Sequence, residues 1–393
     1  MAKAKCSKKA EKNTGKIVKV AVIGCGARGQ YVVKNLIRDS KRNVQVVAAY
    51  DPDREQCVRA MSKEIWDQPE MAICKSYKEA VAFPGVEWVM VFSPNAYHKD
   101  GILEGFKKGK HVFTEKPLAT SIEDCQKIFV AHQKSGVKFA TGFVLRFAPI
   151  YRKVKELLTS GQFGDLISID ANENITPNHG SYIMKNWRRF TSEAGPHILE
   201  KCCHDLDLIN WFVDSKVRRI AAFGGRDFFI PKNKAFNEKY PQCFQETWWD
   251  AHPIDTPFSG DTDLMDNTVA IFEYRNNVRV QFQATMSNAI PERRMNFSCS
   301  KGNIICELYA GIVKWRLLDG NEESIHFVGD NHGGGDSYIM KELYEGPMCQ
   351  EDALPECSGN EGLESAVLAL GIDLAARTGD VIDMEPIWKK LKR

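Results

Sequence analysis

The sequence predicts an α/β protein of two domains: an N-terminal doubly wound parallel sheet, then an α+β domain with a large, mostly antiparallel sheet. Through residue 145, short apolar runs alternate with segments of helical periodicity, the order that produces a parallel sheet. A glycine-rich turn joins the first apolar run to the first helix. After residue 266, apolar runs follow one another at hairpin spacing, which predicts antiparallel strands.

The turn after the first apolar run carries the pattern G-x-G-x-x-G. Because it stands between a β-branched strand and a helix, the pattern predicts dinucleotide binding. Gly24 permits the tight turn, Gly26 lets the backbone approach a pyrophosphate, and Gly29 lets the helix pack closely on the strand. Ala27 and Arg28 supply the first helix amides, which face the anion. The alternative is an ordinary strand-turn-helix with incidental glycines.

The second apolar run, Val44–Tyr50, ends in Asp51, 22 residues after Gly29. An acid at this distance is where the ribose hydroxyls of NAD are bound, and it repels the 2′-phosphate of NADP. Arg28 and Arg54 lie near enough in the sequence to reach such a phosphate. We therefore expect NAD as the cofactor, with NADP as the less favoured alternative.

The other elements of the first domain follow from apolar spacing, caps and breakers. The expected strands are 72–74, 88–92, 111–113 and 137–141. The expected helices are 54–65, 77–83, 99–108, 123–134 and, entering the second domain, 146–159.

Polar side chains stand where two of these buried strands end. Ser93, Asn95 and His98 follow one strand, and Glu115 and Lys116 follow the next. Ligands of open parallel sheets bind outside the carboxyl ends of the strands, so we expect all five at the cofactor. A lysine held there can also hydrogen-bond a substrate hydroxyl and share its proton as hydride leaves the carbon. A loop lysine paired with Glu115 is the alternative.

With these motifs the chain resembles the glucose-fructose oxidoreductase and inositol dehydrogenase (Gfo/Idh/MocA) family of NAD(P)-dependent oxidoreductases. The matching residues are the glycine turn, Pro94-Asn95 with His98, Gly109-Lys110-His111-Val112, Glu115-Lys116-Pro117, Gly142-Phe143, Arg146-Phe147 and a later histidine-bearing helix. The resemblance implies a Rossmann domain over 17–145 and a substrate domain over 146–393. It also implies a homo-oligomer, a dimer or tetramer, assembled through the sheet of the second domain.

A polar, aromatic segment beyond the boundary is expected to be a loop that binds a hydroxylated ligand. It holds Tyr182, Lys185, Trp187 and Arg188, and the family commonly carries a Trp-Arg pair in this region. We expect these residues and Arg146 to contact the substrate. A solvated basic loop is the alternative.

Glu200 and His204 are four residues apart, which on one helix face places a carboxylate beside an imidazole. The resemblance implies that His204 is the catalytic acid/base, and an ordinary histidine pKa of about 6.5 suits that role. The family usually has an aspartate at Glu200 and glycines at Gly195-Pro196-His197, and these departures leave the substrate's identity open. A helix histidine bonded to a backbone carbonyl is the alternative.

The segment 226–264 is long, irregular and aromatic, which predicts a pocket wall that stacks on sugar rings. Trp248 and Trp249 are its expected contacts, and a subunit contact or minor core is the alternative. His332 is expected near the substrate or in a turn, with Asp336 as a helix N-cap. Strands are expected at 267–274, 278–286, 294–299 and 302–308, and a closing helix at 362–378.

The composition excludes several classes of protein. The chain has 393 residues, 43% apolar and 26% charged, and a net charge of +2, values typical of a soluble globular protein. No apolar run approaches the roughly 18–20 residues of a membrane span, and no nucleic-acid signature is present. The 12 cysteines are scattered without a C-x-x-C pair, so we expect no metal site, and reduced thiols in the cytoplasm. The lysine-rich segment 1–16 is expected to be a disordered tail; an exported protein whose leader is absent from this chain is the alternative.

We therefore expect an NAD-dependent oxidoreductase that moves hydride between nicotinamide and a secondary alcohol carbon of a sugar or cyclitol. His204 would take the hydroxyl proton, Lys116 would bond the same oxygen, and Glu200 would orient the substrate or His204. The alternative is an NAD-dependent glycoside hydrolase that transiently oxidises a ring hydroxyl, eliminates the aglycone and returns the hydride. A silent NAD-binding sensor is a third class, which the presence of Lys116 and His204 disfavours.

Overall fold

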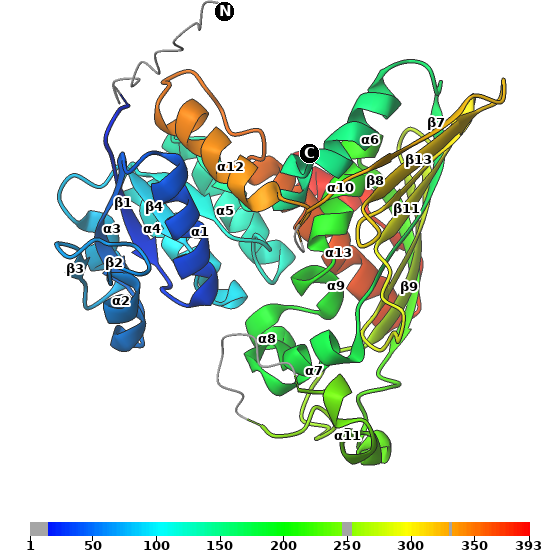
Figure 1. Ribbon diagram of the computed structural model, residues 1–393, viewed down its shortest axis with the longest axis horizontal. Coiled ribbons are helices and arrows are strands. Elements are labelled where there is room, and N and C mark those ends of the chain that lie inside the picture. Colours follow the sequence, from blue (N-terminus) through cyan, green and yellow to red (C-terminus); the bar gives the residue numbers. More distant parts are fainter. Residues whose placement is uncertain (1–14, 246–253, 330–331) are drawn as a thin grey trace, which may run out of the picture.

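The computed structural model describes residues 15–245, 254–329 and 332–393. Two sheets dominate it, a smaller one near the N-terminus and a larger one beyond it, with helices between them (Figure 1). Most of the expected tail, and both Trp248 and Trp249, lie outside the described residues. Lys16 is described, and its ammonium group lies 3.0 Å from the carboxylate of Glu87.

The first sheet has six strands in the order β3-β2-β1-β4-β5-β6, and every pair in it is parallel. This confirms the predicted doubly wound sheet. Its direction of growth reverses between β1 and β4, so the carboxyl ends of these two strands flank the position where such sheets bind ligands. The strands are β1 Val18–Ile23, β2 Val44–Tyr50, β3 Ala72–Ile73, β4 Trp88–Val91, β5 His111–Thr114 and β6 Phe139–Thr141.

The helices of this domain occur close to the expected places. They are α1 Ala27–Asp39, α2 Arg54–Ala60, α3 Tyr77–Ala82, α4 His98–Lys107 and α5 Ile122–Ser135, with a 3₁₀ turn η1 at Asn95–Tyr97. The expectation that α2 reaches residue 65 is wrong, because the chain turns back after Ala60. The amide of Trp66 donates to the Ala60 carbonyl, and the buried Trp66 indole donates to the carbonyl of Gln30 on α1.

The second sheet has nine strands in the order β14-β13-β12-β11-β7-β10-β9-β8-β15. All its pairs are antiparallel except β7 with β10, which confirms a mostly antiparallel sheet. The sequence did not predict β8, β13, β14 or β15; β14, for example, is exposed at every residue and so has no apolar alternation. The strands are β7 Leu166–Asn174, β8 Val217–Gly225, β9 Asn267–Tyr274, β10 Arg279–Thr285, β11 Arg294–Cys299, β12 Gly302–Glu307, β13 Ile312–Leu317, β14 Glu322–His326 and β15 Ile382–Asp383.

One face of this sheet is covered by helices, among them α6, α10 and α13 (Figure 1). The opposite face carries exposed apolar side chains in cross-strand contact, where Phe223 of β8 pairs with Val269 of β9. The helices of the second domain are α6 Pro149–Thr159, α7 Pro177–Lys185, α8 Thr191–Ala194, α9 His197–Glu200, α10 Cys203–Val213, α11 Ala235–Lys239, α12 Gly335–Leu343, α13 Gly359–Thr378 and α14 Glu385–Lys390. Single turns of tighter or wider helix are η2 Val144–Phe147, η3 Trp187–Arg189, η4 Pro231–Asn233, η5 Pro241–Cys243 and η6 Tyr344–Met348.

Three expectations about local structure in this domain are wrong. The segment expected as a loop is helix α7 followed by η3, because the hydroxyl of Thr176 caps the helix and Pro177 stands in its first turn. The expected helix from residue 146 begins only at Pro149, after η2. Gly334, with φ +84°, is the N-cap of α12, so Asp336 lies inside the helix and its carboxylate serves another purpose.

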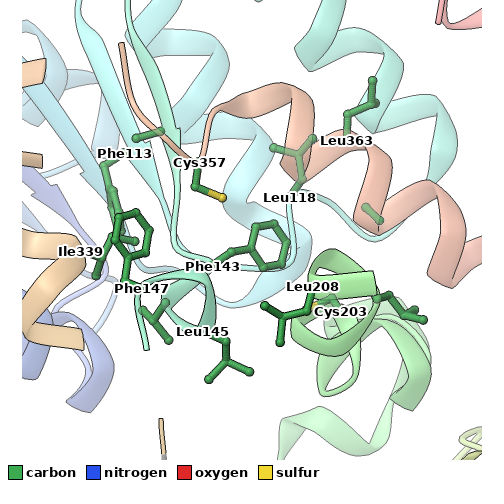
Figure 2. Close-up of a cluster of buried hydrophobic side chains, with 14 of the residues drawn as sticks. Phe113, Leu118, Phe143, Leu145, Phe147, Cys203, Leu208, Ile339, Cys357 and Leu363 are labelled. Atoms are coloured by element: carbon green, nitrogen blue, oxygen red, sulfur yellow. The ribbon is translucent and has the colours of Figure 1, made fainter. Parts of the chain in front are cut away.

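The chain returns to the first domain near its C-terminus. Helix α12 packs on α1, and the amide of Thr141 at the end of β6 donates to the carbonyl of Cys357 (Figure 1). A buried apolar cluster joins both domains at this point, with Phe113 and Phe143 on one side and Leu208 of α10 on the other (Figure 2). This packed junction holds the carboxyl end of β5 against α9 and α10.

Candidate functional site

The glycine turn has the geometry that dinucleotide binding requires. Gly24 has φ +88°, and a Cβ there would lie 2.5 Å from the backbone of Phe92 and Ser93. A Cβ on Gly29 would lie 2.5 Å from the carbonyl oxygen of Gly24. Gly26, the N-cap of α1, has open space where its Cβ would stand, and no described side chain caps the helix. The first amides of α1 are therefore available to an anion, so the turn fits a pyrophosphate.

Asp51 lies at the end of β2 beside this turn. Its Oδ2 accepts a hydrogen bond from the Cys25 amide at 2.7 Å, and its Oδ1 accepts one from the Asp53 amide at 2.9 Å. Burial raises the pKa of Asp51, against these two hydrogen bonds. Each carboxylate oxygen has a second lone pair, so the group can still accept ribose hydroxyls. Arg54 is exposed at the start of α2.

Arg28 is held away from the role of a phosphate ligand. Its Nε donates to Glu115 at 2.8 Å, and its second terminal nitrogen lies 2.8 Å from Asp336 Oδ1. The guanidinium group thus joins α1, the end of β5 and the start of α12. Asp336 also accepts from Nδ1 of His332 at 2.7 Å, so His332 belongs to the same chain of contacts.

Of the residues expected at the cofactor after β4, Asn95 and His98 are hydrogen-bonded to backbone carbonyls, whereas the hydroxyl of Ser93 has no partner among the described residues. The Asn95 side-chain amide donates to the carbonyl of Ala194, across the domain junction, at 2.8 Å. The two ring nitrogens of His98 face the carbonyl oxygens of Pro117 and Ser93 at 2.8 and 2.9 Å, and burial lowers the pKa of this histidine. The hydroxyl of Ser93 is buried with no hydrogen-bond partner in the described structure. A buried hydroxyl without a partner at the ligand edge of the sheet also fits a bound cofactor.

Lys116 extends from the end of β5 to the second domain. Its Nζ donates to the backbone carbonyl of Glu200 at 2.7 Å, at the break between α9 and α10. This break contradicts the expectation that Glu200 and His204 share one helix. The Glu200 carboxylate instead accepts from Arg188 Nε at 3.2 Å. Burial raises the pKa of Glu200, but Lys116 and Arg188 outweigh burial and lower it overall.

His204 is 2% exposed, in the first turn of α10. Its Nδ1 is buried and has no hydrogen-bond partner among the described residues. Its ring lies 5.6 Å from that of His332 and 5.8 Å from that of Phe143. Burial, then the charge of Lys116, lowers the pKa of His204 well below its usual range. The imidazole is therefore neutral near pH 7, and it is a weaker base than the histidine of ordinary pKa that was expected.

A second buried imidazole, His197, lies three residues before Glu200 in the single turn of α9. Both of its ring nitrogens are buried without a hydrogen-bond partner in the described part of the chain. Burial, opposed by Glu173 and Glu200, lowers the pKa of His197 to about 4. Residues three apart in a helical turn share a face, so His197 adds a polar group that the sequence analysis did not assign to the site.

Behind these imidazoles, buried ion pairs hold α10 in place. Arg293 donates to both oxygens of Asp205 at 2.8 and 2.7 Å, and Arg146 donates to both oxygens of Asp207 at 2.7 Å. Arg146 was expected to contact the substrate, but its Nε and one terminal nitrogen donate to Asp207 instead. Arg293 was not among the predicted site residues, although two aspartates on a helix of buried residues indicate that cations must pair with them.

Glu173 of β7 completes this cluster of ion pairs. Its Oε1 lies 3.3 Å from Lys201 Nζ and 3.3 Å from Arg293. Although burial opposes ionisation, Arg293 and Lys201 lower the pKa of Glu173. Lys201 lies in the turn between α9 and α10, so the cluster fixes the segment that joins Glu200 to His204.

The expected substrate contacts on α7 and η3 gather around Arg188. Its guanidinium group lies over the rings of Trp187 and Tyr182, at 4.3 and 5.0 Å from their centroids. Lys185 is buried, and its Nζ donates to the carbonyl of Phe244 at 3.2 Å. Arg188 therefore links Trp187 to Glu200. Tyr182, expected at the substrate, is instead buried in an apolar cluster with Phe244, whose carbonyl accepts from Lys185.

The described residues contain neither a candidate metal site nor a helix that could span a membrane. No group of three or more His, Cys, Asp or Glu side chains in this part of the chain has an arrangement able to hold a metal ion. Within the same residues, no helix has both the length and the apolar character that a membrane crossing requires.

Comparison with known proteins gives matches along most of the chain. Residues 18–143 match the family model "Oxidoreductase family, NAD-binding Rossmann fold", and residues 151–305 match "GFO/IDH/MocA C-terminal domain". The putative oxidoreductase YteT of Bacillus subtilis is 22% identical over 355 residues, 77% of this chain and 83% of that protein. The inositol 2-dehydrogenase of Gluconacetobacter diazotrophicus is 30% identical over 201 residues, 50% of this chain and 55% of that protein. The chain thus aligns with about half the length of this dehydrogenase.

The fold is also found among solved structures. A levoglucosan dehydrogenase in complex with NADH and levoglucosan superposes with a TM-score of 0.76. The superposition covers 94% of this chain and 99% of that one at 15% sequence identity, so the likeness concerns the fold.

Proposed function

The chain belongs to the Gfo/Idh/MocA family of oxidoreductases, with an NAD-binding Rossmann domain, and on that premise we propose that it oxidises a secondary alcohol carbon of a sugar or cyclitol with NAD. The observation that carries the proposal is the hydrogen bond from Lys116 Nζ to the Glu200 carbonyl, between α9 and α10 and near the neutral, buried His204. The sugar and inositol dehydrogenases among the similar proteins support the substrate class.

The chain's own residues account for the proton and the orientation of the substrate. NAD, when bound, supplies the hydride acceptor. The hydroxyl must lose its proton as hydride leaves the same carbon, and His204, whose buried Nδ1 has no partner among the described residues, is proposed to accept that proton. Lys116 Nζ, which donates to a neutral carbonyl and not to a carboxylate, can donate to the substrate oxygen as negative charge develops there.

Glu200 is proposed to orient the substrate. Its carboxylate is ionised and held by Arg188, so it can accept hydrogen bonds from neighbouring hydroxyls of a sugar. Glu115 does not act on the substrate in this scheme. It positions Lys116, because its carboxylate binds both Arg28 and the Lys116 amide.

The preferred cofactor is proposed to be NAD and not NADP. Asp51 accepts a hydrogen bond from the Cys25 amide of the glycine turn, and its charge repels a 2′-phosphate. Arg28, one of the two candidate phosphate ligands, is already bound by two carboxylates.

A second candidate function is an NAD-dependent glycoside hydrolase that oxidises the substrate transiently. The observation that favours it is the partly exposed ring of Trp187, which is joined to Glu200 through Arg188. Aromatic faces bind the apolar face of a sugar ring, so this ring suits a substrate that extends beyond the reacting carbon.

One experiment separates these functions. The purified protein is incubated with free sugars, cyclitols and aryl glycosides while NADH absorbance and aglycone release are followed together. A dehydrogenase accumulates NADH in proportion to the substrate consumed, whereas a hydrolase releases aglycone without net NADH. Tight NAD binding with neither product would contradict both functions.

We also propose a homo-oligomer assembled through the open face of the nine-stranded sheet. Phe223, Val269 and Ile271 are exposed there at 77%, 41% and 59%, a contiguous apolar stripe on β8 and β9. Light scattering coupled to size exclusion tests this proposal. Ile271→Asp is expected to dissociate the assembly, whereas an exposed apolar residue outside the sheet, changed as Val381→Asp, leaves it intact; a monomeric unchanged protein would contradict the proposal.

A further inference from the structure

Two thiols meet beneath the glycine turn. Cys25 stands between Gly24 and Gly26, and Cys57 lies on α2, which begins at the capping residue Asp53. The two sulfur atoms are 3.4 Å apart, and both side chains are fully buried. The contact therefore joins the turn to a helix 32 residues further along the chain.

The sulfur pair is arranged for reaction with itself. A disulfide requires a sulfur separation of about 2.05 Å, so the two sulfur atoms, 3.4 Å apart, need to approach by about 1.4 Å. The thiolate is the reactive form of cysteine, and the hydrogen bond between the two thiols lowers the pKa of Cys57. Cys57 also faces a second thiol, the partner that disulfide formation requires.

The position of Cys25 connects this chemistry to the cofactor. Its amide donates to Asp51 at 2.7 Å, and its carbonyl accepts from the Gln30 side chain at 2.7 Å. Drawing its sulfur toward α2 would shift both contacts and the adjacent Gly26, which has to approach the pyrophosphate closely.

We propose that Cys25 and Cys57 are a modification site: a peroxide converts them to an intramolecular disulfide, and the disulfide weakens dinucleotide binding. The Cys57 thiolate attacks hydrogen peroxide, giving a sulfenic acid and hydroxide. The Cys25 thiol then displaces the sulfenic oxygen, forming the S–S bond and releasing water. The two thiols lose two electrons, which reduce the peroxide, and dithiothreitol reverses the step. The effect on binding rests on the dinucleotide site of the proposed function.

The test uses the full chain, reduced and then treated with hydrogen peroxide in the presence or absence of NAD. Intact mass should show the loss of two hydrogen atoms, and a peptide map should link the peptides that carry Cys25 and Cys57. NAD affinity, measured by calorimetry, should fall about tenfold or more, which corresponds to about 1.4 kcal/mol, and dithiothreitol should restore it. Bound NAD should slow the cross-link, because it holds the turn in place.

Matched variants isolate the pair. Cys57→Ser and Cys57→Ala should bind NAD as the reduced protein does and lose the response to peroxide. Cys74→Ser, which changes another buried cysteine of the same domain, should keep it. Absence of the Cys25–Cys57 cross-link, or a complete cross-link with unchanged NAD affinity, overturns the proposal. If the reduced protein itself fails to bind NAD, the cofactor assignment fails instead, while the peptide map still tests the cross-link.

Discussion

Helices α9 and α10 carry two kinds of buried polar group, carboxylates and imidazoles, which differ in whether they have hydrogen-bond partners. The carboxylates of Asp205 and Asp207 each receive two hydrogen bonds from an arginine, at 2.7–2.8 Å. The imidazoles of His197 and His204 keep buried nitrogens without a partner in the described structure. An unpaired buried polar group costs stability, so it persists where a ligand completes it. We therefore propose that the paired carboxylates stabilise the fold and that the two imidazoles contact the substrate.

The largest effect is expected from breaking a satisfied pair. Arg293→Met would leave Asp205 buried without its cation and Glu173 with Lys201 alone. We expect the unfolding free energy to fall by about 3–5 kcal/mol in urea denaturation. Arg294→Met is the control, because that neighbour is more exposed and its loss should cost less than about 1 kcal/mol. Equal stabilities for the two variants would remove the structural role of the pair.

The unsatisfied His197 should have its effect through pH. Its pKa is lowered to about 4 in the folded protein, against an ordinary value of about 6.5 when unfolded. Below pH 6.5 the unfolded chain gains a proton that the folded chain does not, so folding stability falls as pH falls from about 6.5 to 4, by up to about 3 kcal/mol.

Urea denaturation of the unchanged protein and His197→Gln across this range measures that loss. The variant should lose less stability between pH 7 and 5 than the unchanged protein, while His326→Gln, at an exposed site on β14, should follow the unchanged curve. Parallel curves for His197→Gln and the unchanged protein would show that His197 is not held neutral.

Lys116 differs from the buried arginines, because its ammonium group donates to a carbonyl and has no ion-pair partner in the described structure. Lys116→Met should lower turnover by roughly 100-fold or more, about 2.7 kcal/mol, with NAD affinity and unfolding free energy nearly unchanged. Lys110→Met, at the opposite end of β5, is the matched control. Near-native turnover in Lys116→Met would exclude this lysine from the chemistry.

The smallest effect is expected at Asp51, a carboxylate that is paired and also faces a ligand site. Asp51→Ala should shift the ratio of NAD to NADP affinity by about tenfold toward NADP, or about 1.4 kcal/mol. Asp53→Ala removes the cap of α2 and should lower stability without changing that ratio. A ratio unmoved by Asp51→Ala would show that another group selects the cofactor.

The sequence was informative where local chemistry determines local structure. The glycine turn, Asp51 and Lys116 stand at strand ends, so alternating apolar runs and breakers were enough to predict their positions. Glu200 and His204 were predicted on one helix because spacing alone cannot reveal that Lys116 from another domain bonds the Glu200 carbonyl. Arg293 and Glu173 were missed for the same reason: their partners are distant in sequence, and only the fold brings them together.

The difference between partnered carboxylates and unpartnered imidazoles is tested most simply on two residues of α10. Turnover per folded molecule and unfolding free energy are measured for His204→Asn and for Asp207→Asn. We expect His204→Asn to lose roughly 100-fold or more in turnover, with stability unchanged or higher. Asp207→Asn should lose a few kcal/mol of stability, because Arg146 is left buried without its counter-charge, and should retain turnover within about tenfold. The reverse pattern, with His204→Asn destabilised but active, would contradict it.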